Sequence, residues 1–321
     1  MQRLVFLVLA GLACGATAVV NAQPYPGHPV RLVVPFPPGG AIDTNARALA
    51  RAMEGALGQP FIVDNRGGAN GIIAYDLVAK AAPDGYTLLQ TSVGFVINAG
   101  VYKKLPFNIT TDFTPITNAL MGQGLLMVIN PALPAANLKE FIAYAKTKPL
   151  AYGSPGIGNA LHIIAEGFNA RAGTGMSHIP YKGAGPAMNA LLAGEVQVLF
   201  VPPAVAAQYL PARRLRALGY TGDKRVDFLP DVPTISEAGL AGFNMSTGWH
   251  AWFAPAKTPA IIVKKIHAAL RGVLQEPKLR EFFVNSGYEP VADAPAEFAR
   301  SFQQDIKRWG ELVRTMKIQP D

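Results

Sequence analysis

The chain has 321 residues, of which 50% are apolar and 16% are charged, and its formal net charge is +8 at pH 7. This composition excludes an intrinsically disordered protein and provides enough apolar material for two domains with large cores. The positive residues are scattered or form short pairs. We therefore expect no nucleic-acid partner, and the charge favours a small anionic ligand.

Residues 1–22 have the pattern of a secretory signal peptide. Arg3 provides a positive start, residues 4–13 form an apolar run too short to span a bilayer as a helix, and Val20-Asn21-Ala22 fits a signal-peptidase site. We expect cleavage after Ala22 and export to the periplasm, and a membrane anchor is the less favoured alternative. The net charge of +8 minus the charge of Arg3 leaves +7 on the mature chain.

The single cysteine of the chain, Cys14, lies inside this predicted signal peptide. The mature chain would therefore contain no cysteine, and disulfides, thiol chemistry and Cys-based metal sites are not expected in it. The residues just before Cys14 lack the aliphatic side chain that lipid attachment prefers at the third position before the cysteine.

From residue 30 onward, short β-type runs alternate with amphipathic helical segments. Residues 30–36 are mostly apolar and rich in β-branched valine, and they are followed by a proline- and glycine-rich turn. Apolar residues then recur at helical spacing up to Leu57. Further helices are predicted to start near Ile72, Asn137 and Asn159. Further strands are predicted at residues 61–64, 86–91, 125–129, 150–154, 177–181, 196–201 and 215–220.

This alternation predicts an α/β fold with mostly parallel sheets flanked by helices. From Thr258 onward the pattern becomes mainly helical. The last predicted helix begins at Pro295 and repeats large apolar residues, which we interpret as packing groups rather than a binding stripe.

Three glycine-rich turns lie between predicted strands and helices, at residues 35–40, 154–159 and 181–185. Ligands of open parallel sheets bind at the carboxyl ends of the strands. Glycine lets a ligand approach the backbone, and the free N–H groups at a helix start attract anions. The three turns are therefore the expected ligand-binding elements.

Three side chains near these turns have competing interpretations. Asp43 is expected to accept backbone N–H groups rather than to act as a base. His162, one turn into its predicted helix, either faces the ligand or bonds its own loop. Lys182, the one charged residue inside a glycine turn, either pairs with a carboxylate or is simply solvated.

Catalytic and cofactor motifs are incomplete. Leu161 occupies the third position of the near-dinucleotide pattern at Gly156 and Gly158, and Tyr152 replaces the first glycine of a nucleophile elbow. The five histidines show no metal-ligand spacing. The sequence therefore predicts no enzyme, no cofactor and no metal.

Several motifs along the chain resemble the substrate-binding receptors of tripartite tricarboxylate transporters, also called Bug proteins. They are the segment from Tyr25-Pro26 to Gly39-Gly40-x-x-Asp43, Leu57-Gly58-Gln59-Pro60, Val63-x-Asn65-Arg66, Ala82-Pro83-Asp84-Gly85-Tyr86-Thr87-Leu88, Leu105-Pro106-Phe107, Pro180-Tyr181-Lys182-Gly183 and Leu229-Pro230-Asp231-Val232-Pro233-Thr234-x-x-Glu237-Ala238-Gly239. The resemblance implies a two-lobed periplasmic binding protein-like fold with a ligand cleft between the lobes. It places lobe 1 at residues 23–124 plus 249–321 and lobe 2 at residues 125–248, with crossings near Gly124 and Gly248.

The resemblance further implies that backbone amides, hydroxyls and waters from both lobes hold a ligand carboxylate. Carried onto this sequence, the expected lining residues are Phe36, Pro38, Gly39, Asp43, Thr91 and Ser92 in lobe 1 and Ser154, Gly156, Gly158, Asn159, His162, Tyr181, Lys182 and Gly183 in lobe 2.

This sequence departs from the family pattern at Val201-Pro202-Pro203, where relatives commonly carry a polar pair. The departure favours a dicarboxylate, or an aromatic or otherwise apolar carboxylate, over an amino acid. Trp249 and Trp252 either form an aromatic wall of the site or pack at the hinge, and we favour hinge packing.

These features together predict a periplasmic, monomeric receptor that captures a small carboxylate and delivers it to membrane transporter subunits. A sensory receptor that presents its ligand to a signalling partner is the alternative. An exported hydrolase is less favoured, because the sequence offers no activated nucleophile and no paired carboxylates.

Overall fold

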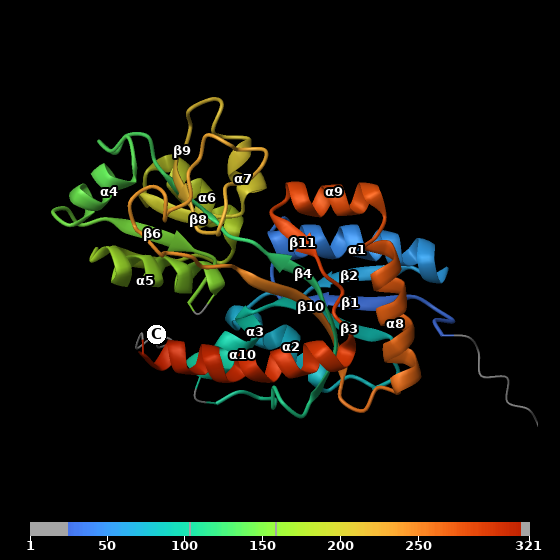
Figure 1. Cartoon of the computed structure of the whole chain (residues 1–321). Helices are drawn as coiled ribbons and strands as arrows, with labels where there is room; N and C mark the ends of the chain where they lie inside the picture. The colour runs from blue at the N-terminus through green and yellow to red at the C-terminus, as the bar shows by residue number, and fades with distance from the viewer. Residues whose placement is uncertain (1–24, 103, 158, 316–321) are drawn as a thin grey trace, which may run out of the picture.

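The computed structural model describes residues 25–102, 104–157 and 159–315, without the side chain of Leu312. The predicted signal peptide with Cys14, and the predicted ligand residue Gly158, lie outside the described residues. The described chain forms two lobes, each built on its own β-sheet and covered by helices (Figure 1). The two-lobed α/β architecture expected from the sequence is confirmed.

Lobe 1, as we use the name from here on, is built on a six-stranded sheet of order β11-β4-β10-β3-β1-β2. Its strands are β1 (Val30–Val34), β2 (Phe61–Asn65), β3 (Thr87–Ser92), β4 (Phe113–Gly122), β10 (Gly248–Pro255) and β11 (Tyr288–Pro290). Its helical elements are α1 (Ala41–Leu57), the single turn η1 (Ala69–Gly71), α2 (Ile72–Ala79), α3 (Gly94–Val101), α8 (Ala260–Val273), α9 (Pro277–Asn285) and α10 (Pro295–Thr315).

Lobe 2 is built on a five-stranded sheet of order β7-β6-β8-β5-β9. Its strands are β5 (Leu126–Ile129), β6 (Ala151–Ser154), β7 (Ser177–Pro180), β8 (Val198–Val201) and β9 (Arg216–Tyr220). Its helices are α4 (Leu138–Ala145), α5 (Ala160–Ala172), α6 (Ala184–Ala193) and α7 (Pro203–Ala207).

The strand directions correct one expectation, because both sheets are mixed rather than mostly parallel. In lobe 1, β1 runs parallel to β2 and β3, but β10 runs antiparallel to β3 and β4, and β11 runs antiparallel to β4. In lobe 2, β6 runs parallel to β7 and β8, whereas β5 runs antiparallel to β8 and β9. The chain leaves lobe 1 along β4 and returns along β10, so these two neighbouring strands run in opposite directions.

The lobe 1 sheet is buried on both faces, as expected for a sheet between two helix layers. Leu32 and Val34 on β1 pack toward α1 and α8, whereas Val33 between them packs toward α2, α3 and α10. The aromatic residues Phe298 and Phe302 of α10 are buried in that second layer. The interpretation of the last helix as a packing element is therefore confirmed.

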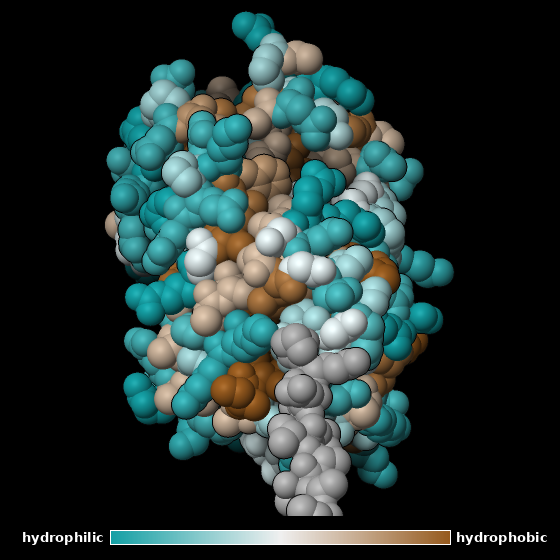
Figure 2. Space-filling view, turned by 90° about the vertical axis from the view of Figure 1, so that its right-hand side faces the viewer, coloured by the Kyte–Doolittle hydropathy of each residue, from teal (hydrophilic) through white to brown (hydrophobic). Residues whose placement is uncertain are grey.

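The exposed large apolar side chains of the described residues are spread over several elements of both lobes. On the side of the molecule shown in Figure 2, apolar residues run down the middle of the face and hydrophilic residues line both of its edges. Over the whole described part of the chain, the exposed large apolar side chains are Ile62, Ile73, Ile179, Phe228, Ile261, Phe282, Val284 and Val291.

Candidate functional site

Loops from the two lobes approach each other at two points, which define the interlobe junction. A Cβ atom built on Gly183, at the start of α6, would lie 3.9 Å from Cγ of Pro37 in the loop after β1. The side chain of Asn70 on η1 donates a hydrogen bond of 2.6 Å to the carbonyl oxygen of Ile157 in the loop after β6. All three glycine-rich turns of the sequence therefore reach this junction.

The loop after β1 is held in shape by a buried carboxylate. Asp43, 3% exposed, accepts hydrogen bonds from the N–H of Gly39 (2.9 Å), from the amide of Asn65 (2.9 Å) and from the guanidinium of Arg47 (3.1 Å). Asn65 also donates to the carbonyl oxygen of Phe36 at 2.9 Å. Asp43 thus accepts a backbone N–H as predicted, although this N–H precedes helix α1.

The same contacts fix the charge of this carboxylate. Burial opposes ionisation of Asp43, but the hydrogen bonds from Arg47, Gly39 and Asn65 outweigh it and lower the pKa of Asp43 below its usual value. The negative charge is therefore compensated within the loop. Phe36 is half-buried, and Pro38 and Gly39 are exposed at the end of the loop.

The chain segments that approach each other at Pro37 and Gly183 each lead into a helix, α1 from Ala41 and α6 from Ala184. The N–H groups of Ala41, Ile42 and Asp43 open α1 and have no acceptor among the described residues, and the same is true of Ala184 and Gly185 at the start of α6. Unpaired N–H groups at a helix start carry partial positive charge and bind anions. The partly positive N-terminal ends of one helix from each lobe therefore lie near the junction.

The end of β3 contributes buried hydroxyls. The Thr91 hydroxyl is fully buried and lies 3.1 Å from the hydroxyl of Tyr75 on α2, and Ser92 is 6% exposed and accepts the N–H of Gly94 at 3.4 Å. Thr91 therefore packs in the lobe 1 interior, while Ser92 shapes the turn into α3.

The loop after β6 rests on a stack of rings. The imidazole rings of His162 and His178 stack with centroids 3.9 Å apart, and the Tyr152 ring stacks on His178 at 5.0 Å. The buried hydroxyl of Ser154 lies 2.6 Å from Nε2 of His178 and donates to the carbonyl oxygen of Gly156 at 3.0 Å. Burial, together with the neighbouring His178, lowers the pKa of His162 to about 3, so its imidazole is neutral.

The remaining predicted residues flank this loop. Asn159 caps α5 by accepting the N–H of Leu161 at 3.0 Å. Tyr181 is half-buried, Gly183 is buried, and Lys182 is exposed without an ion pair to any described residue. The assignment of these residues as ligand contacts stays a prediction.

Sequence reasoning missed two residues at the junction. Asn98 on α3 is fully buried, accepts the amide of Asn70 at 2.6 Å and donates to the carbonyl oxygen of Asn70 at 2.9 Å. The available signal was a further glycine-rich run, Gly67-Gly68-Ala69-Asn70-Gly71, which follows β2 just as the three recognised turns follow their strands.

Trp249 and Trp252 pack within lobe 1, on opposite faces of β10. The indole N–H of Trp249 donates to Asp305 on α10 at 2.8 Å, and that of Trp252 donates to Gln90 on β3 at 2.9 Å. Both indoles are buried. Neither indole therefore forms an aromatic wall; Trp249, next to Gly248 at the crossing, agrees with the favoured hinge packing, whereas Trp252 packs in the lobe 1 core.

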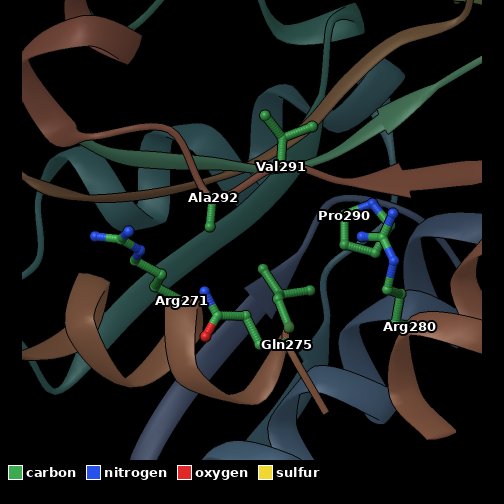
Figure 3. Close-up of a pocket in the computed structure, with 7 residues that line it drawn as sticks. Arg271, Gln275, Arg280, Pro290, Val291 and Ala292 are labelled. Carbon is green, nitrogen blue, oxygen red and sulfur yellow. The ribbon is translucent and has the colours of Figure 1, made fainter. Parts of the chain in front are cut away.

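A separate pocket of about 410 Å³ lies in lobe 1, between α8, α9 and the chain after β11 (Figure 3). Arg271, Gln275 and Arg280 line it together with Pro290, Val291, Ala292 and Leu274. Arg280 pairs with Glu289, so part of its positive charge is neutralised. The pocket contains none of the loop residues at the interlobe junction.

Within the part of the chain that the structure describes, no group of three or more histidine, cysteine, aspartate or glutamate residues is arranged to hold a metal ion. In the same part of the chain, no helix has the length and apolar character needed to cross a membrane.

Two lobes joined through paired strands, with glycine-rich loops of both lobes meeting at the junction, define the class of two-lobed solute-binding proteins. Residues 45–318 match the family described as tripartite tricarboxylate transporter family receptor. The match covers most of the chain, and the chain belongs to this family.

Solved structures agree with the assignment. The periplasmic binding protein BugD is 33% identical, with a TM-score of 0.85 over 92% of this chain and 100% of that chain. A protein of R. palustris solved with adipate is 32% identical, with a TM-score of 0.87 over 92% of this chain and 100% of that chain. MatC from Rhodopseudomonas palustris, solved with malate, is 32% identical, with a TM-score of 0.80 over 90% of this chain and 100% of that chain.

Proposed function

We propose that this chain is a periplasmic receptor that binds a small dicarboxylate between its lobes and delivers it to the membrane subunits of a tripartite tricarboxylate-type transporter. The observation that carries the proposal is the approach of the loop at Pro37, which leads into α1, to Gly183 at the start of α6, because the first N–H groups of both helices are unpaired among the described residues. Such groups bind carboxylates without any charged side chain.

The charges near the junction support an anionic ligand. Asp43 is already paired with Arg47 and with the N–H of Gly39 and therefore presents little unscreened negative charge. Lys182 is exposed beside Gly183 and has no ion-pair partner among the described residues. The loops thus offer hydrogen-bond donors and positive charge to a ligand.

Two observations support a dicarboxylate in particular. Adipate and malate, with which the two R. palustris relatives were solved, are both dicarboxylates. After β8 this chain continues with Pro202 and Pro203, which have neither a side-chain acceptor nor a backbone N–H. An amino acid would find no side-chain acceptor for its ammonium group at these two residues, so we propose that amino acids bind poorly.

In this proposal the ligand contacts are twelve of the fourteen residues predicted from the sequence, with Gly158 among them, and the fully buried Thr91 and Ser154 support the contacting loops. The first lobe supplies the loop around Gly39 and the turn at Ser92. The second lobe supplies the starts of α5 and α6, at Asn159 and Gly183. Because the ligand contacts both lobes, its binding shifts the equilibrium between the open and closed forms toward the closed form.

An exported hydrolase is a weaker proposal, although Ser154 lies 2.6 Å from Nε2 of His178. A nucleophile must reach its substrate, and Ser154 is fully buried and already donates to the carbonyl oxygen of Gly156. We infer that the pair supports the loop and that the receptor has no catalytic residue.

We also propose that residues 1–22 are a signal peptide that directs export of the chain. We propose that cleavage after Ala22 releases a monomeric mature chain into the periplasm, in keeping with the periplasmic relative BugD. Amino-terminal sequencing of the protein from a periplasmic extract tests the cleavage position. A first residue of Gln23 is expected, and retention of Met1 would contradict it.

A thermal-shift screen of residues 23–321 tests the ligand class. A ligand that binds only the folded state raises the unfolding temperature with concentration, because it stabilises that state by mass action. We expect adipate, malate or another dicarboxylate to raise the midpoint and amino acids to leave it unchanged. A rise with amino acids alone would overturn the carboxylate assignment.

A further inference from the structure

The turn that carries Asn70 has an unusual backbone. Gly68, Ala69, Asn70 and Gly71 all have positive φ values, of 117°, 46°, 51° and 92°. Glycine adopts such angles without strain, and asparagine tolerates them better than most other residues. The turn therefore holds a side chain at Asn70 in a backbone conformation that would accept glycine more easily.

The Asn70 side chain connects the two lobes. Its amide nitrogen donates to the carbonyl oxygen of Ile157 in lobe 2 and to the side-chain oxygen of Asn98 in lobe 1, each at 2.6 Å. Asn98 in turn donates to the backbone oxygen of Asn70 at 2.9 Å. The fully buried Asn98 therefore fixes both the backbone and the side chain of Asn70 for a contact with the opposite lobe.

The neighbouring contacts between the lobes are apolar. Ala160 and Ile163 of α5 share a buried cluster with Tyr75 and Phe95 of lobe 1, and Ile157 packs against the same cluster. Apolar contact has little directional preference, so it brings the lobes together without fixing their orientation. Among the hydrogen bonds between described residues, the one from Asn70 to Ile157 joins the two lobes away from the connecting strands.

We propose that Asn70 is a closure latch, a positioning residue whose hydrogen bond to Ile157 forms only when the lobes are closed. Hinge opening separates η1 from the loop after β6 and breaks this bond, whereas the bonds to Asn98 stay within lobe 1. The latch therefore lowers the free energy of the closed state and slows the release of ligand. Only its effect on release rests on the proposed function.

The size of the effect follows from ordinary hydrogen-bond energetics. One net hydrogen bond changes an equilibrium by roughly threefold to tenfold, so removal of the latch should lower the closed-to-open ratio by about that factor. The dissociation rate of a ligand should rise by a similar factor of about three to ten.

Two substitutions remove the donor in different ways. Asn70→Gly removes the side chain and accepts the positive φ, and Asn70→Asp keeps the shape but replaces the amide donor by an acceptor. Ala69→Gly is the matched control, because Ala69 is the neighbouring residue, also has a positive φ and is not a donor to lobe 2.

The experiment measures the separation of the lobes directly. The mature chain, residues 23–321, has no cysteine of its own, so Lys146→Cys on lobe 2 and Lys264→Cys on lobe 1 give an exposed pair for donor and acceptor dyes. Single-molecule energy transfer without ligand then reports the closed fraction. We expect both Asn70 variants to have a smaller closed fraction and Ala69→Gly to match the parent.

Stopped-flow dissociation of adipate and of malate is the second measurement. Faster release from both Asn70 variants, with association rates close to the parent, supports the latch. An unchanged closed fraction in both Asn70 variants overturns it. If neither dicarboxylate binds the parent, the proposed ligand class fails, and the ligand-free closed fraction still decides the latch.

Discussion

At the residue scale, the candidate site depends on buried polar side chains that position the loop residues next to them. Asp43 accepts the N–H of Gly39 and so fixes the loop after β1. The fully buried Asn98 accepts the amide of Asn70 and so fixes that side chain. Buried polar groups keep a defined geometry because every unpaired donor or acceptor costs free energy. The ligand loops can therefore be shaped before any ligand arrives.

The substitution Asp43→Asn tests this at the first loop. The new side chain would offer the Arg47 guanidinium and the Gly39 N–H only one acceptor oxygen, so we expect a loss of about 2 kcal/mol in the free energy of unfolding. Urea unfolding measures it. Glu289→Gln, which removes the negative charge that pairs with the exposed Arg280 in lobe 1, should cost well under about 1 kcal/mol. Equal losses in the two variants would show that the Asp43 contacts contribute no more than a surface pair.

A second residue-scale prediction concerns acid. His250 on β10 is buried, accepts the amide of Asn45 on Nδ1 at 3.1 Å and lies 4.6 Å from the ring of Tyr288, and burial lowers its pKa to about 3. The unfolded chain binds the proton more readily, so stability is fully present above pH 6.5 and falls as the pH decreases toward 3.

Between pH 6.5 and pH 5 this single histidine should cost about 2 kcal/mol of stability, at about 1.4 kcal/mol per pH unit. Urea unfolding at about pH 7.5 and pH 5 measures the loss. His250→Gln should lose less stability than the parent over the same interval, whatever its stability at the higher pH. An identical loss in both proteins would exclude His250 as a source of the acid sensitivity.

At the element scale, the clearest patterns in the sequence correspond to β1, α1 and the loop between them, because the apolar periodicity of these segments is regular. The pattern did not reveal β4 and β10, because both contain buried polar residues. Thr117 on β4 is fully buried and donates to the carbonyl oxygen of Asp293 at 2.7 Å, and His250 interrupts the apolar run of β10. The hydrogen-bond partners of these buried polar residues lie far away in the sequence. The local spacing of apolar residues therefore cannot reveal strands that contain them.

The same reasoning applies to the site. The glycine-rich turns were recognised because each follows a strand within a short stretch of sequence. The contact between Asn70 and Ile157 joins residues 87 positions apart, so no local pattern indicates it. The sequence therefore predicts three of the loops that meet at the junction, but neither the loop of Asn70 nor the side chains that connect the lobes.

The contact between α10 and β10 gives a prediction at the element scale. The buried indole N–H of Trp249 donates to Asp305, and Asp305→Ala would leave that donor unpaired. We expect a loss of about 1 to 3 kcal/mol in the free energy of unfolding. Glu311→Ala, on the same helix but exposed, should change it by less than about 0.5 kcal/mol. A loss no larger than the control would show that water replaces the carboxylate.

At the scale of the whole molecule, the chain leaves and re-enters lobe 1 through glycines. Gly122 at the end of β4 pairs with Gly248 at the start of β10, next to the two connections that join the lobes. A Cβ on Gly122 would collide with Oγ1 of Thr247, and a Cβ on Gly248 would lie 2.9 Å from Cβ of Val93. The crossing is therefore tightly packed and has no room for larger residues.

Gly248→Ala tests this arrangement. Gly248 has φ of +73°, which alanine adopts only with strain, and its new methyl group would displace Val93 at the start of α3. We expect a loss of about 2 to 3 kcal/mol in the free energy of unfolding. Gly272→Ala on α8, where a Cβ meets no atom within 4 Å, should instead stabilise the protein by about 0.5 to 1 kcal/mol. If Gly248→Ala is as stable as the parent, the crossing accommodates a methyl group without strain, and the orientation of the lobes must then be fixed by the loop contacts alone.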